Sequence, residues 1–284
     1  MELIDIKKVI RQKYKGYMPN FVFKWLERLI EQDELNRLHT LTKDMSGVDA
    51  ADRLIEELDQ SVEVIGADRL PPKEERCLFV SNHPLGGADG IIYTSLLGRY
   101  YDGNIALLVN DVLLNLEQFS DVFVPVNKYG TQGRDRHKMI EEALQSDKQV
   151  FTFPAGLCSR LENGEIRDTE WHVSFVRMAK RSQRTVVPLY FDGVNSDRFY
   201  NWANRRKRMG VKFNYELILL PSEFVHSKGK HYRIYVGEPI APEDLPSGTS
   251  IHAFADRVYQ EIYNYPERYA NEPKELLVSK KEKH

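Results

Sequence analysis

The sequence predicts an α/β fold in which a largely parallel central sheet is flanked by helices and preceded by an N-terminal helical segment. Short apolar runs alternate with amphipathic stretches through the middle of the chain. This alternation is typical of parallel strands that are joined by helices. The chain has 284 residues, 42% of them hydrophobic, and is long enough to bury one substantial core.

The first part of the chain has the pattern of helices. One apolar stripe at helical spacing is formed by Val22, Leu26, Leu29 and Ile30. Further on, Ser46 precedes acidic residues and an apolar series, which is the pattern of a capped helix start. We therefore expect residues 1–60 to form a helical segment.

After this segment the chain alternates between predicted strands and predicted helices. The strands are short apolar runs bounded by turn residues, expected at 62–66, 77–80, 105–109, 122–126, 149–153, 185–191, 213–220 and 231–237. The helices are expected at 89–99, in a leucine-rich stretch after Val109, and at 134–146, 172–181 and 249–263. Because parallel strands present functional residues at their carboxyl ends, we expect the site beyond the ends of the central strands.

The pattern divides the chain into three parts. We expect a helical segment at 1–60, an α/β domain at 61–268 and a charged C-terminal tail at 269–284. The last residues, Lys280–His284, are nearly all charged, so we expect them to be disordered.

Composition excludes several classes of protein. The formal net charge of -2 argues against a dedicated nucleic-acid binder, which is normally strongly basic. The two cysteines, Cys77 and Cys158, argue against a disulfide scaffold and for a reducing compartment. The sequence shows neither a signal-peptide pattern nor an apolar run of the roughly 18 residues that a spanning helix needs. We expect a cytoplasmic protein that is soluble or held at a membrane surface.

The segment Phe79–Gly90 is the most informative part of the chain. It places His83 and Asp89 on either side of Gly86 and Gly87, after an apolar run. A histidine whose second nitrogen is held by a carboxylate can take a proton from a hydroxyl near neutral pH. The glycine amides are candidate donors to an oxyanion. A loop histidine beside a helix-capping aspartate is the plainer interpretation of the same spacing.

Other residues carry weaker signals. Cys158 is a possible nucleophile, but no nucleophile-elbow pattern surrounds it, and a packed structural cysteine is the simpler interpretation. Trp171 is expected to be a packing anchor. The basic run Arg205–Arg208 follows Trp202, and it fits a docking site for an anionic membrane or an acidic carrier protein. A solvated charged loop is an equally open interpretation of that run.

The Phe79–Gly90 segment resembles the glycerolipid acyltransferase family, that of 1-acyl-glycerol-3-phosphate acyltransferase. That family has four residues between its histidine and aspartate, whereas five separate them here. Pro125–Lys128 resembles the second block of the family, Phe153–Cys158 the third and Val187–Pro188 the fourth. The resemblance covers roughly residues 61–240 and implies a glycerolipid-acyltransferase-like fold.

The departures from the family pattern concern the acceptor. Ala155 stands where the family has a glutamate, and Cys158 stands at its arginine position, with Arg160 two residues later. With these changes the motifs are similar to a bacterial, haemolysin-like branch that is associated with acylating lyso-aminolipids such as glycine or ornithine lipids. The resemblance implies that His83 is the base and that Asp89 orients it.

The resemblance also implies the partners. The acyl donor would be a thioester of acyl carrier protein or coenzyme A, the acceptor a lyso-lipid hydroxyl at the inner face of the membrane, and neither metal nor cofactor would be needed. The candidate acceptor-binding residues are Lys128, Arg134, Phe153, Pro154, Gly156 and Arg160. Acylation of 1-acyl-glycerol-3-phosphate or glycerol-3-phosphate is the first alternative, and a non-catalytic lipid-binding module on the same fold is the second.

Overall fold

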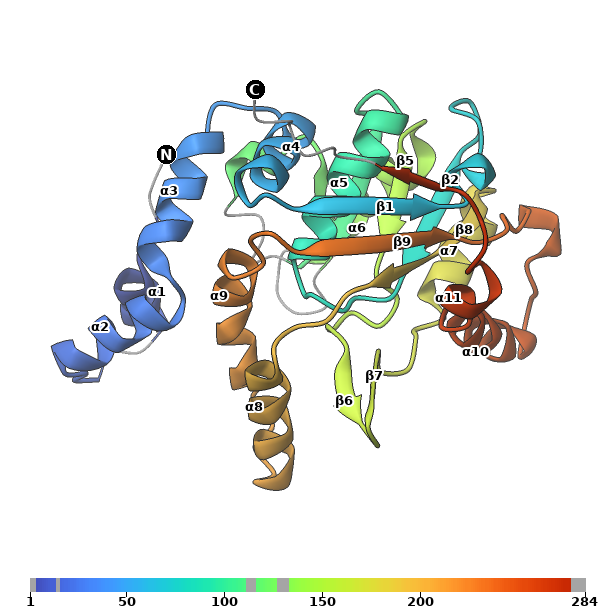
Figure 1. Ribbon diagram of the computed structural model, residues 1–284. Coiled ribbons are helices and arrows are strands. Elements are labelled where there is room, and N and C mark those ends of the chain that lie inside the picture. The colour runs from blue at the N-terminus through green and yellow to red at the C-terminus, as the bar shows by residue number, and fades with distance from the viewer. Residues whose placement is uncertain (1–3, 14–15, 111–115, 127–132, 277–284) are drawn as a thin grey trace.

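The computed structural model describes residues 4–13, 16–110, 116–126 and 133–276 (Figure 1). Within them, the central sheet has eight strands in the order β10-β1-β9-β8-β2-β5-β3-β4. The strands are β1 Ser61–Ile65, β2 Cys77–Ser81, β3 Ile105–Val109, β4 Phe123–Pro125, β5 Gln149–Thr152, β8 Thr185–Asp192, β9 His231–Val236 and β10 Lys274–Leu276. Among the described strands of this central sheet, only the β8–β9 and β1–β10 pairs are antiparallel, so the predicted, largely parallel sheet is confirmed.

Helices cover both faces of this sheet (Figure 1). They are α1 Ile6–Lys13, α2 Asn20–Leu29, α3 Gln32–Thr42, α4 Gly47–Glu57, α5 Ala88–Tyr100, α6 Gly133–Gln145, α7 Ser174–Ser182, α8 Asp197–Arg208, α9 Leu220–Val225, α10 Ser250–Ile262 and α11 Tyr265–Arg268. Short 3-10 turns lie at Ala67–Arg69, Glu117–Phe119, Tyr215–Leu219 and Pro242–Asp244.

Strand β2 contributes side chains to a hydrophobic core on each face of the sheet. Phe79 packs in the cluster that includes buried residues of α4 and α5, while Leu78 and Val80 pack in the cluster that includes residues of α7 and α10. Successive side chains of a strand point to opposite faces, so a strand covered on both sides is apolar throughout. All five residues of β2 are buried, as a central parallel strand requires.

The predicted N-terminal helical segment is confirmed, and its last helix belongs to the main core. Leu54 and Ile55 of α4 lie in the same cluster as Phe79 of β2 and Ile92 of α5. Because this helix buries its apolar face against α5, it helps to fix the helix on which Asp89 lies.

The predicted strand at 213–220 is wrong. This stretch forms the 3-10 turn Tyr215–Leu219 and then enters α9, which has Pro221 in its first turn. Proline suits the first turn of a helix but cannot donate a hydrogen bond inside a sheet. Leu219 is buried against Phe199 and Tyr200 of α8, which explains the apolar composition without a strand.

Three other segments differ from the expectation or extend it. The chain forms a two-stranded hairpin, β6 Arg160–Glu162 and β7 Glu165–Arg167, that the sequence pattern did not indicate. The basic run Arg205–Arg208 is the last turn of α8, so it lies on a helix and not in a loop. Strand β10 lies in the predicted tail and pairs with β1. The leucine-rich helix expected after Val109 falls largely on residues 111–115, and Lys280–His284 lies beyond residue 276, both outside the described residues.

Candidate active site

The candidate site lies beyond the carboxyl ends of two neighbouring parallel strands. His83 follows β2, and Phe153 follows β5, which pairs with β2 in parallel. Asp89 is the second residue of α5, so the loop between β2 and α5 carries both members of the predicted pair. The sheet therefore brings His83, Asp89 and Phe153 to one edge, as the strand pattern predicts.

His83 and Asp89 are in direct contact. The Nδ1 atom of His83 lies 2.9 Å from Oδ2 of Asp89, and the Asp89 side chain is fully buried. Asp89 also accepts hydrogen bonds from the main-chain amides of Leu85, Gly87 and Gly90, at 2.9, 3.0 and 2.9 Å. A buried carboxylate needs such donors, because without them it would take up a proton.

The environment shifts the pKa values of the pair in opposite directions. Burial raises the pKa of Asp89, but the charge and hydrogen bond of His83 and the loop amides outweigh it and lower the pKa below its usual value. Burial lowers the pKa of His83, and the charge and hydrogen bond of Asp89 outweigh it and raise the pKa. With Nδ1 held by Asp89, Nε2 is the nitrogen through which His83 can accept a proton.

Gly86, in the loop between His83 and Asp89, has a backbone conformation and surroundings that favour glycine. Its φ is +69°, which is the left-handed region that favours glycine. A Cβ atom there would lie 2.8 Å from Cδ1 of Leu220 and 3.1 Å from Cβ of Cys158. Gly87 donates its amide to Asp89 instead of pointing it at a substrate, so the predicted oxyanion role does not fit that amide. For Gly86 that role stays a prediction.

Phe153 contacts the imidazole of His83. Its ring stacks on the imidazole of His83, with ring centroids 3.8 Å apart and an interplanar angle of 24°. This contact and the Asp89 hydrogen bond together fix the ring plane of His83. Pro154 is buried and Gly156 is exposed in the turn that follows, with a φ of +66°.

Arg160 is already paired within the fold. Its guanidinium is buried, donates to the carbonyl oxygen of Cys158 at 2.7 Å, and forms an ion pair with Glu216 at 3.1 Å. Glu216 is also paired with Arg206 of α8, at 2.8 Å. Through Glu216, Arg160 therefore links the segment around Cys158 to α8. Of the other predicted acceptor cations, Lys128 lies outside the described residues, and Arg134 lies in α6 with a side chain outside them.

Cys158 does not have the environment of a nucleophile. The residue is buried, and burial raises the pKa of its thiol to about 11. The reactive thiolate is therefore disfavoured at neutral pH. The interpretation of Cys158 as a packed structural cysteine fits the structure better than the nucleophile interpretation.

Asp168 is part of the site, although the sequence pattern did not reveal it. Its carboxylate accepts hydrogen bonds from the main-chain amide of His83 at 3.1 Å, from the hydroxyl of Ser159 at 2.6 Å and from the indole of Trp171 at 3.0 Å. Trp171 is buried, as a packing anchor should be, and it also donates to Asp168. The one sequence signal was an aspartate three residues before a tryptophan, which many solvated loops also contain.

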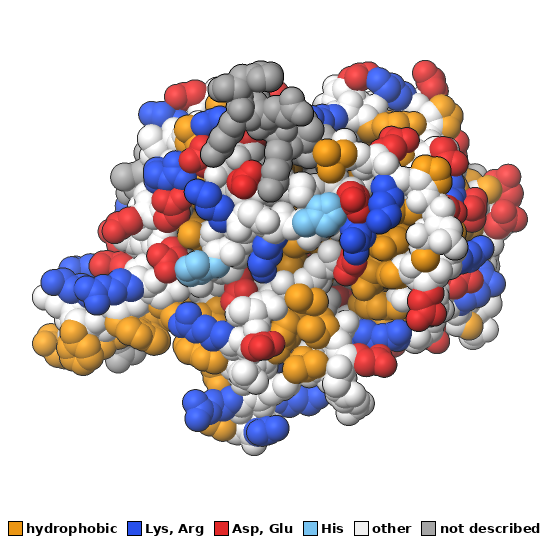
Figure 2. Space-filling model, in the orientation of Figure 1, with side chains coloured by type: hydrophobic (Ala, Val, Ile, Leu, Met, Phe, Trp, Pro, Cys, Tyr) orange, Lys and Arg blue, Asp and Glu red, His pale blue; other side chains and the backbone are white. Residues whose placement is uncertain are grey.

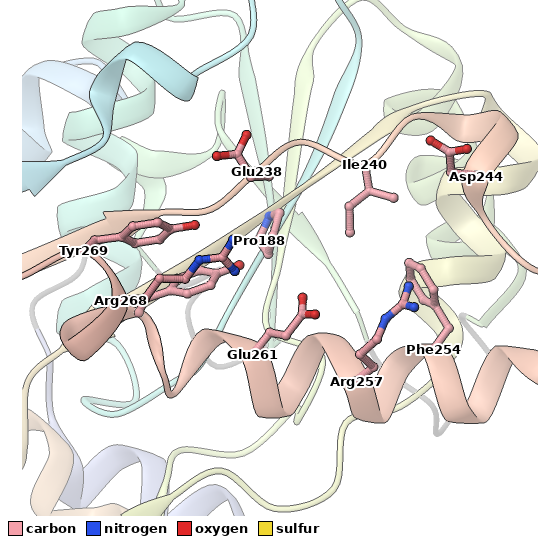
Figure 3. Close-up of a pocket in the computed structure, with 10 residues that line it drawn as sticks. Pro188, Glu238, Ile240, Asp244, Phe254, Arg257, Glu261, Arg268 and Tyr269 are labelled. Carbon is pink, nitrogen blue, oxygen red and sulfur yellow. The ribbon is translucent and has the colours of Figure 1, made fainter. Parts of the chain in front are cut away.

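A small pocket lies elsewhere on the molecule (Figure 3). It has a volume of about 170 Å³ and lies between the sheet and the α10–α11 region. It is lined by Pro188, Glu238, Ile240, Asp244, Phe254, Arg257, Glu261, Tyr265, Arg268 and Tyr269. None of these residues is a contact partner of His83 or Asp89, so the pocket is separate from the paired residues.

Two further features of the described residues bear on other kinds of site. No three His, Cys, Asp or Glu side chains of this part of the chain lie together as metal ligands would. No helix within the same residues combines the length and the apolar character needed to cross a membrane.

Comparisons with known proteins show what this chain resembles. A family model described as "Acyltransferase" matches residues 9–268. A protein named lyso-glycine lipid O-acyltransferase from Phocaeicola vulgatus is 45% identical over 242 residues, covering 84% of this chain and 86% of that protein. One of the same name from Bacteroides thetaiotaomicron is 43% identical over 265 residues, covering 92% and 97%. The crystal structure of the 1-acyl-sn-glycerophosphate acyltransferase from Thermotoga maritima aligns with a TM-score of 0.47 and 13% identity over 94% of this chain and 90% of that one.

Proposed function

The chain belongs to the acyltransferase family and is an O-acyltransferase, and from this premise we propose that it transfers a fatty acyl group to the hydroxyl of lyso-glycine lipid. The choice of acceptor is supported by the 43–45% identity, along most of the chain, to two proteins named lyso-glycine lipid O-acyltransferase. Within the predicted class of lyso-aminolipids, these relatives favour the glycine lipid over the ornithine lipid.

We propose that His83 is the general base of this transfer. Its Nε2 atom takes the proton of the acceptor hydroxyl as that oxygen attacks the carbonyl carbon of an acyl thioester. Asp89, 2.9 Å from Nδ1, fixes the tautomer and stabilises the imidazolium that forms. The tetrahedral intermediate then collapses, the C–S bond breaks, and the thiol leaves with the proton from His83. The donor is the thioester of acyl carrier protein or coenzyme A, and this route uses neither metal nor cofactor.

The test is an assay with defined lipids. Purified protein is given a long-chain acyl thioester, on acyl carrier protein or on coenzyme A, together with lyso-glycine lipid. We expect stoichiometric thiol release and a diacylated product that carries the added mass of one acyl chain. 1-Acyl-glycerol-3-phosphate and glycerol-3-phosphate serve as matched acceptors.

Each alternative has its own outcome in this assay. Turnover that prefers 1-acyl-glycerol-3-phosphate or glycerol-3-phosphate would contradict the glycine-lipid proposal and support the first alternative. Lipid binding without any thiol release, for every acceptor and both donors, would support the non-catalytic module.

We further propose that the protein docks on the inner face of an anionic membrane. Phe21 and Trp25 lie one turn apart on α2 and are 72% and 53% exposed, and Phe213, after α8, is 77% exposed. The last turn of α8 carries the basic run Arg205–Arg208. Exposed aromatics beside basic residues are the composition of a surface that binds anionic lipid headgroups.

These features gather in one part of the molecule. Leu26 and Leu29 of α2 pack in the same cluster as Phe199 and Tyr200 of α8. In Figure 1 α2 lies at the lower left of the molecule and α8 extends to its bottom, and Figure 2 shows hydrophobic side chains on the underside of the left-hand projection and Lys and Arg side chains at the bottom. One surface can therefore offer both the aromatic and the basic contacts.

Vesicle sedimentation tests this docking surface. We expect binding to vesicles that contain anionic lipid, with weaker binding at high salt. The double change Phe21→Ser and Trp25→Ser should weaken binding by about tenfold or more, since each buried side chain contributes about 1.5–3 kcal/mol. Met139→Ser is the control, because Met139 is an exposed apolar residue on α6. Equal binding by both variants would contradict the proposal, and retention on immobilised acidic carrier protein alone would favour the carrier instead.

A further inference from the structure

A second buried carboxylate stands beside His83, and the mechanism above gives it no role. Asp168 follows the β6–β7 hairpin and is 6% exposed. Both of its carboxylate oxygens lie within hydrogen-bond distance of the main-chain amide of His83, at 3.1 and 3.2 Å. The proposed base therefore has one carboxylate at its ring and another at its peptide.

The segment that contains Asp168 holds the peptide of His83 at both of its polar groups. While Asp168 accepts from the amide of His83, the amide of Ser159 donates to the carbonyl oxygen of His83 at 2.8 Å. The hydroxyl of Ser159 donates in turn to Asp168 at 2.6 Å, which closes a ring of hydrogen bonds. Both the amide and the carbonyl group of His83 are therefore hydrogen-bonded to this segment, which restrains the main chain at that residue.

Asp168 is itself fixed from the other side. The hydroxyl of Tyr263 accepts from the amide of Asp168 at 2.8 Å, and the hydroxyl of Tyr259 donates to its carbonyl oxygen at 3.0 Å. Both tyrosines lie in or next to α10, which packs on the sheet. The position of Asp168 is thus set by the body of the fold and not by the loop that it supports.

The hydrogen bonds at its side chain suit an ionised carboxylate. The amide of His83, the hydroxyl of Ser159 and the indole of Trp171 all donate to it. A protonated carboxyl would need an acceptor in place of one of these donors. Burial raises the pKa of Asp168 above its usual value, and these three hydrogen bonds offset only part of that rise.

We propose that Asp168 is a positioning residue that acts through His83: it fixes the peptide of the base and places a negative charge where the imidazolium forms. This role rests on the proposed function of His83 as the base. The charged groups that face His83 are Asp89 at the start of α5, Asp168 after β7 and Arg160 in β6, and the first two favour its protonated form while Arg160 opposes it.

The decisive measurement is the titration of His83 in Asp168→Asn. This change removes the charge and keeps the shape. In protein labelled with ¹³C-histidine, the His83 signal is the one missing from His83→Ala. We expect the midpoint of its titration to move to lower pH by about half a unit or more, because a nearby negative charge favours the imidazolium. Asp256→Asn is the matched control, since Asp256 is an exposed aspartate of α10.

Activity gives a second readout of the same variant. The base must be neutral to act, so transfer falls as pH drops through the pKa of His83. In Asp168→Asn the acid limb of kcat/KM should move to lower pH. Above that limb kcat should be roughly ten- to a hundredfold lower, with an unchanged KM for the acceptor. A purely structural role would lower activity without moving the limb.

The outcomes separate this proposal from the proposed function. The titration needs no substrate, so it decides the role of Asp168 even if the wild-type protein transfers no acyl group. An unchanged midpoint in folded Asp168→Asn would overturn the proposal. If that variant does not fold, the carboxyl carbon of Asp168 in the wild-type protein must show an inflection at the His83 midpoint, and its absence would overturn the proposal equally.

Discussion

Replacing His83 by alanine is expected to lower kcat for acyl transfer by about 10²- to 10⁴-fold, which is the usual contribution of a positioned general base. The fold should remain, because Asp89 keeps its hydrogen bonds from the amides of Leu85, Gly87 and Gly90 when the imidazole is removed. The measurement is the initial rate of thiol release with saturating lyso-glycine lipid, together with a thermal unfolding curve.

His252→Ala is the matched control for this experiment. His252 is an exposed histidine of α10, away from the loop that follows β2. The control should retain the full rate. If His83→Ala kept more than a tenth of the wild-type kcat while both variants stayed folded, His83 would not be the base.

The second large effect is expected for Asp89→Asn, which should lower both activity and stability. The carboxylate accepts from one ring nitrogen and three amides, whereas an asparagine has only one accepting oxygen. At least one donor then faces the NH₂ group, which costs about 1–3 kcal/mol of folding free energy. With the tautomer of His83 no longer fixed, kcat should fall by up to about 10⁴-fold.

The pH dependence of Asp89→Asn separates its two roles. Asp89 raises the pKa of His83, so the acid limb of the residual activity should lie at lower pH than in the wild-type protein. Kinetics between pH 5 and 9 and denaturant unfolding measure the two effects. Asp256→Asn, which removes an exposed carboxylate, should change neither. An unshifted limb with full kcat would show that Asp89 only caps α5.

The contact between His83 and Asp89 could be predicted because it is local. The two residues are six apart, and the glycines between them already indicated a loop that folds the pair together. The sheet could be predicted for a similar reason, since each buried strand carries its own apolar run. The resemblance to the acyltransferase family rested on these same segments, and the family match confirms it.

The parts that could not be predicted depend on contacts between distant segments. Asp168 is 85 residues from His83, and nothing near it in the sequence indicates which amide it accepts from. Arg160 lies beside the motif where a substrate-binding cation is expected, yet it forms an ion pair with Glu216. Glu216 lies in the stretch at 213–220 that the sequence pattern assigned to a strand. Helix α8 was not predicted, because its last turn is entirely basic and its buried side chains are few. They are Phe199, Tyr200 and Ala203.

The hydrogen bonds around His83 close loops of very different length, and this has a consequence for folding. The bond to Asp89 closes a loop of six residues, whereas the bond to Asp168 closes one of 85. Short loops form early at little entropic cost, and long ones form only when the intervening strands and helices are in place. The pair can therefore assemble while the chain is still incomplete, but the peptide of His83 is held only after β5 has joined the sheet and the β6–β7 hairpin, which forms its own two-stranded sheet, has folded. A nascent chain would therefore hold the imidazole of His83 through Asp89 before the peptide of His83 is fixed, and the site would be complete only with the last long-range contacts.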